Sequence, residues 1–365
     1  MSSSTKDTLP IGSTIGILGG GQLGRMLALA AARLGFHTHI YCPDAAGPAA
    51  EAASFETNGA YEDLAALERF ANACDVVTYE FENVPAMTAR TAAKASLLRP
   101  NAKALDVAQD RLTEKTFIRD TAGVAVADFR DAADAHEARR AVRALGLPSV
   151  IKTRRFGYDG KGQAVIRHED DLASAFGTLP KDAPCIVEAF VPFKREVSVI
   201  AARGANGDHA SYPLIENVHK NHILHSSTVP APNTSDELSA RASKLAFKIM
   251  DELDYIGVMA TEFFELEDGS LIVNEIAPRV HNSGHWTQNA GCIDQFELHI
   301  RAITGWPLGN TQPLLNVVMT NLIGDDVDKV AALAAGADTH IHLYGKSEAR
   351  AGRKMGHINK VSPKA

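Results

Sequence analysis

The chain has 365 residues, of which 45% are hydrophobic and 22% are charged. This composition is typical of an ordinary soluble globular protein and argues against a disordered or coiled-coil chain. The 37 Lys and Arg residues against 44 Asp and Glu give a formal net charge of −7, which argues against broad electrostatic binding to nucleic acid or to an acidic membrane. At roughly 150 residues per domain, the length predicts two or three domains.

The cysteines and the N-terminal segment indicate a cellular compartment. The four cysteines are far apart and form no C-x-x-C pair: Cys42, Cys74, Cys185 and Cys292. Neither a disulfide framework nor a cysteine-based zinc site is therefore predicted. The first ten residues are polar, and no segment approaches the ~18 apolar residues of a membrane span. We expect a cytoplasmic protein that does not enter a membrane.

The first hundred residues alternate between strand and helix patterns. In chain order they predict a strand at Ser13–Leu18, a glycine turn at Gly19–Gly24, a helix at Arg25–Leu34, a strand at His37–Tyr41, a helix at Leu64–Ala73 and a strand at Cys74–Tyr79. This alternation is typical of a parallel sheet with crossover helices. We predict a doubly wound α/β domain over residues 1–105.

The rest of the chain has a different texture, with strand patterns separated by glycine and charge, as in an antiparallel α+β fold. The predicted helices are Ala104–Asp120, Ala132–Leu145 and Glu237–Leu253, the predicted strands are Ser149–Thr153, Gln163–Ile166, Cys185–Ala189 and Glu196–Ala202, and Ser226–Asp236 is a predicted loop. We place a second domain at residues 106–305 and a small C-terminal lobe at 306–365.

The glycine turn fits a dinucleotide-binding fingerprint. Gly19, Gly21 and Gly24 have the G-x-G-x-x-G spacing between a strand and a helix, and Asp44 lies 20 residues beyond Gly24, where a nicotinamide enzyme places its ribose-binding carboxylate. The same backbone can hold a single phosphate, or form a tight turn without a ligand. A nicotinamide oxidoreductase is therefore one hypothesis.

A second glycine-rich segment follows the strand that ends near Lys152. Residues 154–163 contain three glycines and three cations, which is the chemistry of a flexible lid over a polyphosphate. The spacing is not that of a P-loop. The alternative is an exposed basic hairpin tip.

Two glutamates are predicted to face each other on a hairpin. If Asp268-Gly269 is a two-residue turn, the cross-strand pairs are Glu262 with Glu275, Phe264 with Val273, and Leu266 with Leu271. Two carboxylates then end an apolar stripe, and they repel each other unless a cation or a shared proton compensates. Mg²⁺ beside a nucleotide is the favoured solution, and the alternative is an exposed hairpin end.

Three histidines, His219, His222 and His225, lie three residues apart. Their segment lacks helical periodicity and no cysteine accompanies it, which argues against zinc. We expect one of them to contact a ligand and the others to be solvated.

Together these segments resemble the ATP-grasp superfamily and, within it, the family of 5-(carboxyamino)imidazole ribonucleotide synthetases. The segments that carry the resemblance are Gly19–Met26, Tyr79–Pro85, Asp110-Arg111 with Lys115, residues 154–163, Glu188–Val191, Asn274-Glu275, Ala277–Trp286 and Gly352–His357. The resemblance covers about residues 13 to 362. It implies an ATP-grasp fold with an N-terminal pre-ATP-grasp domain, a lid at about residues 120–190, and a homodimer.

The resemblance also implies a reaction, in which ATP phosphorylates bicarbonate to carboxyphosphate, and the carboxyl group then passes to the amine of 5-aminoimidazole ribonucleotide. ATP and Mg²⁺ (or Mn²⁺) are the implied cofactors, and the partners are small molecules only. The implied ATP contacts are Arg111, Lys152, Gly157, Tyr158, Asp159, Gly160, Lys161, Gly162, Gln163, Glu188, Ala189, Phe190, Val191, Glu196, His219, Asn274 and Glu275, and the implied metal ligands are Glu262 and Glu275.

For the ribonucleotide and the carboxyl transfer, the resemblance implies a further set of residues. The implied substrate contacts are Gly21, Gln22, Leu23, Glu80, Tyr158, Asp159, Ser283, Lys346 and Arg353, and the implied catalytic residues are Asp159 as a base with Arg279, His281 and Asn282 around carboxyphosphate. One position departs from the superfamily, because Ala277 stands where many members carry a metal-binding Asn. Asn274 or water are the substitutes. A nucleotide-binding regulator without catalysis is the remaining alternative.

Overall fold

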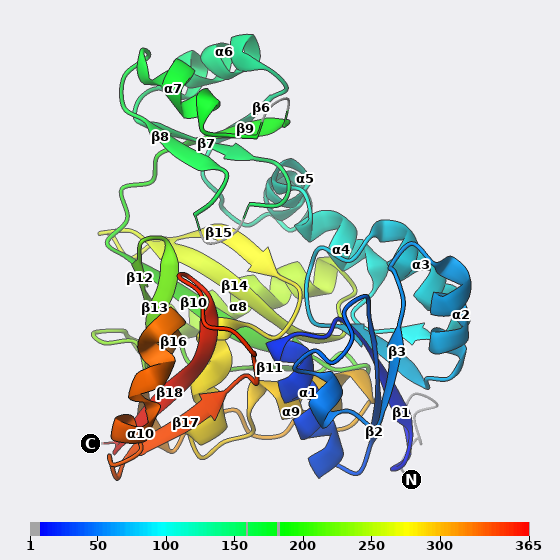
Figure 1. The fold of residues 1–365 in the computed structure, drawn as a ribbon. Helices are drawn as coiled ribbons and strands as arrows, with labels where there is room; N and C mark the ends of the chain where they lie inside the picture. Colours follow the sequence, from blue (N-terminus) through cyan, green and yellow to red (C-terminus); the bar gives the residue numbers. More distant parts are fainter. Residues whose placement is uncertain (1–7, 158–159, 181–182, 365) are drawn as a thin grey trace.

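The N-terminal part of the chain forms a parallel sheet, as its alternating pattern predicts. The computed structural model describes residues 8–157, 160–180 and 183–364. Five strands pair in the order β3-β2-β1-β4-β5. Their bounds are β1 Thr14–Leu18, β2 His37–Cys42, β3 Phe55–Asn58, β4 Val76–Tyr79 and β5 Leu97–Leu98, and the connecting helices are α1 Gln22–Arg33, α2 Leu64–Asn72 and α3 Ala86–Ala95. Every pairing is parallel, so the doubly wound unit is confirmed (Figure 1).

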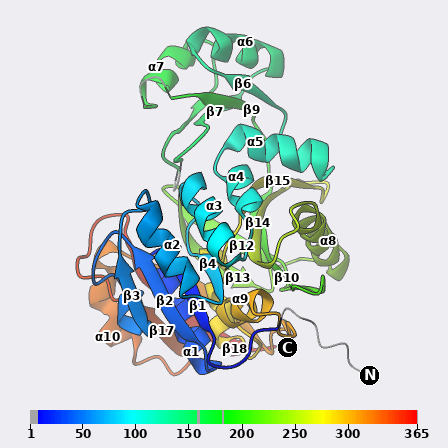
Figure 2. The same ribbon diagram turned by 90° about the vertical axis from the view of Figure 1, so that its right-hand side faces the viewer.

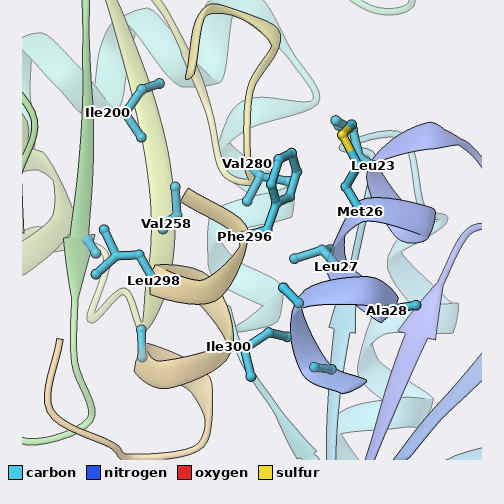
Figure 3. Close-up of a cluster of buried hydrophobic side chains, with 14 of the residues drawn as sticks. Leu23, Met26, Leu27, Ala28, Ile200, Val258, Val280, Phe296, Leu298 and Ile300 are labelled. Carbon is cyan, nitrogen blue, oxygen red and sulfur yellow. The ribbon is translucent and has the colours of Figure 1, made fainter. Parts of the chain in front are cut away.

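Helix α1 joins this sheet to the rest of the molecule. Its apolar face packs against α9 (Gln295–Ile303), and Figure 3 shows Leu23 and Leu27 of α1 facing Phe296 and Ile300 of α9. Each fully buried side chain of this size contributes about 2 kcal/mol. The packing fixes the glycine turn, which lies at the start of α1, against the second sheet.

The second sheet is the largest element of the fold. Its strands follow the order β15-β14-β10-β12-β13-β16-β18-β17, with β11 beside β10. The bounds are β10 Arg195–Arg203, β11 His209–Ser211, β12 Ile215–Lys220, β13 Ile223–Val229, β14 Gly257–Glu265, β15 Leu271–Ala277, β16 Leu315–Ile323, β17 Thr339–Leu343 and β18 Lys354–Pro363. Helix α8 (Asp236–Glu252) covers one face and buries Ala242 and Ile249 there.

The C-terminal segment is part of this sheet. Strand β16 pairs with β13 along four residues, and β18 and β17 continue beyond it. The strands of the last sixty residues therefore extend the large sheet. Their short helix is α10 (Val330–Leu333). The predicted boundary at residue 306 stays a prediction.

A third, four-stranded sheet stands apart from the other two (Figure 1 and Figure 2). Its order is β6-β9-β7-β8, with bounds β6 Phe129–Ala132, β7 Ser149–Thr153, β8 Gln163–Ile166 and β9 Cys185–Ala189, and with helices α6 Ala135–Leu145 and α7 Asp171–Gly177. It has its own small apolar core. The glycine-rich loop joins β7 to β8.

Two predicted elements differ from the structure. The helix expected over Ala104–Asp120 is divided into α4 (Ala102–Ala108), α5 (Arg111–Thr116) and a π-helical turn (Phe117–Thr121). Asp110 causes the break, because its carboxylate accepts from the backbone N–H groups of Leu112 and Thr113 and so starts a new helix. The loop expected over Ser226–Asp236 begins only after Val229, because those Ser and Thr residues pair in β13.

All four cysteines are described and free, so no disulfide joins them. Among the described helices, none is long and apolar enough to cross a membrane.

A buried histidine joins the first two sheets. His299 Nδ1 accepts from the N–H of Val258 on β14 at 3.1 Å, so Nε2 carries the proton and donates to Thr78 Oγ1 on β4 at 2.8 Å. Burial lowers the pKa of His299 to about 3. The ring is therefore neutral at physiological pH, and each of its nitrogens is bonded to a different sheet.

We predict that Thr78→Val destabilises the protein by about 1–3 kcal/mol, because it leaves the buried Nε2–H without an acceptor at nearly constant side-chain volume. The midpoint of urea denaturation, followed by circular dichroism, measures the change. Thr116→Val, on the exposed face of α5, is the control and should change the free energy of unfolding by no more than about 0.5 kcal/mol. Equal midpoints for the two variants would show that His299 does not join the sheets.

Candidate active site

The two glutamates singled out on the hairpin are cross-strand partners. Glu262 on β14 pairs with Glu275 on β15, as predicted. The other predicted pairs are wrong, because Phe263 is opposite Val273 and Phe264 is opposite Ile272. The register of the strands shifts between the carboxylates and the turn.

Two departures from the simple hairpin compensate each other. The turn closes with Leu266 N–H bonded to the carbonyl of Ser270 at 3.0 Å, so it contains three residues and not two. A bulge then adds Asn274 to β15 between the partners of Glu262 and Phe263. The bulge restores the pairing of the carboxylates and brings Asn274 and Glu275 together to the same cavity.

The carboxylate pair has the charge and the donor atoms of a cation site. Glu262 is only 16% exposed, and burial together with the charge of Glu275 raises the pKa of Glu262 to about 8. Glu275 responds differently: burial acts to raise its pKa, but Arg111, 2.9 Å away, outweighs this and lowers it. In the described part of the chain, the buried Oδ1 of Asn274 has no hydrogen-bond partner. Three oxygen donors beside one cavity suit Mg²⁺.

A cavity of about 710 Å³ opens above this pair. It is lined by the large sheet, by the four-stranded sheet, and by the turn at α1 and the loop after β4 of the N-terminal domain. Most of the predicted site residues lie on its wall. They are Gly21, Gln22, Leu23, Glu80, Arg111, Lys152, Gly157, Gly160, Lys161, Gln163, Glu188, Ala189, Phe190, Val191, Glu196, His219, Glu262, Asn274, Glu275, Arg279, His281 and Asn282. Residues that are far apart in the sequence are thus brought to one space.

Other predicted site residues lie elsewhere. Gly162 is packed against Thr153, and Ser283 is fully buried behind His281, so neither lines the cavity. Lys346 and Arg353 lie beside the cavity wall, where Lys354 takes the position facing the cavity. Tyr158 and Asp159 lie outside the described residues.

One end of the cavity has an excess of positive charge. Lys152 Nζ lies 2.9 Å and Lys115 Nζ 3.5 Å from the same oxygen, Oε2 of Glu188. Burial alone acts to raise the pKa of Glu188, but the two lysines outweigh it and hold this pKa at about 2. Two cations thus share one anion, and Arg111 lies close by. Such a site attracts a polyanion.

The glycine turn already holds an anion, and that anion belongs to the protein. Both carboxylate oxygens of Glu80, on the loop after β4, accept from backbone N–H groups at the start of α1: Oε1 from Gly21, and Oε2 from Gly24 at 2.6 Å. A Cβ at Gly19 would lie 2.4 Å from Glu80 Cγ, so the glycines make room for this side chain. Asp44 is exposed and away from the cavity. The geometry leaves no place for a pyrophosphate at the turn.

A third group of charges lies around the metal-site candidates. Arg279 pairs with Glu82, and burial and Arg279 together lower the pKa of His281 to about 3. His281 Nε2 lies 3.3 Å from Glu262 Oε1. The amide of Asn282 exchanges two hydrogen bonds with that of Asn321 on β16, at 2.7 and 3.1 Å. The C-terminal strands therefore hold Asn282 in place.

Several lining residues were not predicted. They are Phe81, Glu82, Asn83, Val150, Val165, Phe193, Asn217, His222, Leu224, Phe264 and Lys354. Strand alternation could have found some of them, because Phe264 and Asn217 lie two residues from Glu262 and His219 on the same strand faces. Phe193 stacks on Phe264 with ring centroids 4.6 Å apart, a contact between distant segments that no local pattern shows.

The three histidines form no metal site. His219 and His222 line the cavity, whereas His225 lies beside Lys220 at 2.9 Å. Within the described ranges, no group of three His, Cys, Asp or Glu side chains is placed to hold a metal ion. More than one of these histidines therefore faces the cavity, and none has a zinc-like environment.

We predict that Gly19→Ala displaces Glu80 and destabilises the protein by more than Gly12→Ala does. Both glycines have positive φ, but a Cβ at Gly12 meets nothing within 4 Å, so the control isolates the backbone strain of about 1–2 kcal/mol. The difference between their thermal unfolding midpoints measures the contact with Glu80. Equal destabilisation would contradict the proposed seat for this carboxylate.

Three family models match the chain in order. The ribonucleotide synthetase preATP-grasp domain matches residues 12–109, the ATP-grasp domain matches 118–296, and the phosphoribosylaminoimidazole carboxylase C-terminal domain matches 317–365. Together they account for the parallel sheet, for the four-stranded sheet with most of the large sheet, and for the C-terminal strands. The expected ATP-grasp fold is confirmed.

Curated relatives and solved structures agree with these matches. N5-carboxyaminoimidazole ribonucleotide synthase of Brucella melitensis is 51% identical over 98% of this chain and 99% of its own length, and that of Bacillus subtilis is 41% identical over 97% and 93%. An ADP complex of an N5-carboxyaminoimidazole ribonucleotide synthetase superposes with a TM-score of 0.94 at 43% identity, covering 98% and 94% of the two chains. The Aspergillus clavatus enzyme in complex with ADP and 5-aminoimidazole ribonucleotide gives 0.90 at 32%, covering 97% and 94%. The chain belongs to the N5-carboxyaminoimidazole ribonucleotide synthase family of ATP-grasp ligases.

Proposed function

We propose that the protein carboxylates 5-aminoimidazole ribonucleotide with ATP and bicarbonate, giving 5-(carboxyamino)imidazole ribonucleotide, ADP and phosphate in purine biosynthesis. The observation that carries this function is the opposed pair Glu262 and Glu275, with the orphan Asn274 oxygen, at the floor of a cation-lined cavity. ATP supplies the driving force, because its terminal P–O bond breaks as the phosphoryl group passes to a bicarbonate oxygen. The C–N bond then forms as the carboxyl C–O bond breaks and phosphate leaves.

The phosphates of ATP fit the cationic end of the cavity. Arg111 and Lys152 project there from α5 and β7, and Lys161 reaches it from the glycine-rich loop. The buried Oε1 of Glu188 has no partner among the described residues, so it can accept from an amino group of the base. The stacked rings of Phe193 and Phe264 also line the cavity and offer an apolar platform for the base.

Mg²⁺, held by Glu262, Glu275 and Asn274, would neutralise the phosphates and polarise the transferring phosphoryl group. Arg111 keeps Glu275 ionised and so ready to bind a cation. Asn274 takes the place of the superfamily Asn that Ala277 replaces. Mn²⁺ has the same ligand preferences and can substitute.

Arg279, His281 and Asn282 surround the position for bicarbonate and carboxyphosphate. The guanidinium of Arg279 is fixed by Glu82, so it can stabilise charge that develops on the transferring group without rearranging. Lys346, Arg353 and Lys354 lie together near the turn that holds Glu80, and we assign them the ribonucleotide phosphate. We keep Asp159 as the proposed base for the amine.

Two further proposals concern the setting of the reaction. We propose a cytoplasmic location, because the four thiols are free and a reducing compartment keeps them so. We also propose a homodimer, which rests on the family resemblance. Small molecules remain the only proposed partners.

ADP release should require both bicarbonate and 5-aminoimidazole ribonucleotide for its full rate. A coupled assay for ADP, with each substrate omitted in turn, measures this requirement. ADP formation that is indifferent to the ribonucleotide, or that responds to glycinamide ribonucleotide instead, would contradict the proposal.

Saturable binding of NADH or NADPH, followed by fluorescence, would support the oxidoreductase hypothesis.

We predict that Glu275→Gln lowers kcat by about 100-fold or more, because a neutral amide holds Mg²⁺ poorly. The variant should keep the fold, because the carboxylate opens to the cavity and is 39% exposed. Glu267→Gln, on the exposed turn of the same hairpin, is the matched control and should retain full activity. Turnover of Glu275→Gln at the wild-type rate in magnesium would exclude the metal-binding role.

A further inference from the structure

A line of buried polar side chains runs through the large sheet to His281. Ser227 Oγ on β13 donates to Asn217 Oδ1 on β12 at 2.7 Å, and Asn217 Nδ2 donates to Ser198 Oγ on β10 at 2.8 Å. Ser198 Oγ lies 2.9 Å from Ser283 Oγ, which lies 2.9 Å from His281 Nδ1. The three serines are fully buried. The four hydrogen bonds are continuous, and they end at a ring that faces the cavity.

The donors and acceptors of this line allow one continuous direction. An amide nitrogen can only donate, so Ser198 Oγ accepts from Asn217 and its own proton is free to point to Ser283. Ser283 Oγ can accept that proton and donate its own to His281 Nδ1. In this arrangement the hydroxyl protons all point toward the imidazole.

A second contact, independent of the hydroxyls, selects this direction. The backbone N–H of Ser283 also points at His281 Nδ1, at 3.3 Å, where the ring caps the 3-10 helix Asn282–Asn289. A backbone N–H can only donate, whichever way the amide of Asn217 is turned. Nδ1 of His281 thus accepts from both the hydroxyl and the backbone N–H of Ser283, and it carries no proton. The proton of the neutral ring must lie on Nε2, on the side of Glu262 and the cavity.

We propose that His281 works as a neutral Nε2–H hydrogen-bond donor to the transferring carboxyphosphate, and that Ser283, Ser198, Asn217 and Ser227 are positioning residues that hold it in this tautomer. The proposal rests on the proposed function and deepens it. A ring in this tautomer has no free lone pair toward the cavity, so His281 does not take the proton of the ribonucleotide amine. The proposal also gives Ser283 a role behind the imidazole in place of direct substrate contact.

A fixed donor suits this position. Arg279 and Asn282, its neighbours on the cavity wall, can also donate to oxygen. Donors that are oriented before the reaction stabilise developing negative charge without reorganisation. A ring free to exchange tautomers would present a lone pair to the same oxygens for part of the time, and that arrangement is repulsive.

The tautomer can be measured without any substrate. The full-length protein is labelled with ¹⁵N in its histidine rings, and long-range ¹H–¹⁵N correlation spectra are recorded at neutral pH, with His281→Gln identifying the His281 signals. We expect one signal pair with a protonated Nε2 and an unprotonated Nδ1. A protonated Nδ1, a doubly protonated ring, or averaged shifts would overturn the proposal.

The positioning role is tested by kinetics. Ser283→Ala should lower kcat by about five- to tenfold, as expected for one lost hydrogen bond, and leave the KM values for ATP and the ribonucleotide within about twofold. Ser198→Ala should have the same pattern with a smaller effect. The control is Ser243→Ala, a similarly buried serine that bonds Ser211 on the far side of the sheet, and it should leave both constants unchanged.

The two tests separate the outcomes. Wild-type kcat in both Ser283→Ala and Ser198→Ala would overturn the positioning role, and a rise confined to KM would do so as well. If ribonucleotide did not stimulate ADP release in the wild-type protein, the proposed function would fail. The spectrum would still show which nitrogen of His281 carries the proton, so the two failures can be distinguished.

Discussion

The repulsion between two carboxylates is the constraint on which the rest of this site depends. Strand pairing holds the backbones of Glu262 and Glu275 directly opposite each other. Their surroundings compensate in different ways: Arg111 pairs with Glu275, whereas Glu262 has the Nε2–H of His281 beside it and a pKa raised to about 8. A divalent cation between the two carboxylates would remove their electrostatic repulsion and so stabilise the site. The cation site thus follows from the geometry of the sheet.

The other charged residues of the cavity are arranged so that positive charge is concentrated where phosphates would bind. A protein with a net charge of −7 binds two phosphorylated ligands by concentrating cations locally, and the clearest example is the pair Lys115 and Lys152 on the single carboxylate of Glu188. Each partner here is buried, so the surplus charge is poorly screened by solvent. The glycine turn shows the opposite arrangement, because there the protein fills a ready anion site with its own Glu80.

Much of the fold could be predicted from local patterns. The strands Ser149–Thr153, Gln163–Ile166 and Cys185–Ala189 have their predicted bounds, because short β-branched runs between turns carry a strong local signal. The extension of the large sheet by β16–β18 could not be predicted, since strand order depends on contacts between distant segments. The division of the helix at Asp110 could have been predicted, because aspartate is a preferred residue at the start of a helix, where it accepts from the first backbone N–H groups.

The sequence predicted which residues form the candidate site better than it predicted their contacts. The pairing of Glu262 with Glu275 was right although the turn was wrong, because the bulge at Asn274 offsets the extra turn residue. The glycine spacing alone could not show that Glu80 occupies the turn, since that carboxylate belongs to the loop after β4, more than fifty residues further along the chain. The network behind His281 is likewise invisible in sequence, because Ser198, Asn217 and Ser227 come from three strands.

The central claim is that the opposed carboxylates bind a divalent cation beside the nucleotide. Its most direct test is the binding of Mn²⁺ to the ADP-loaded protein, measured by electron paramagnetic resonance for the wild type and for Glu262→Gln. The account predicts saturable binding of Mn²⁺ by the wild-type protein and at least about tenfold weaker binding by the variant. Equal affinity in the two proteins would contradict it.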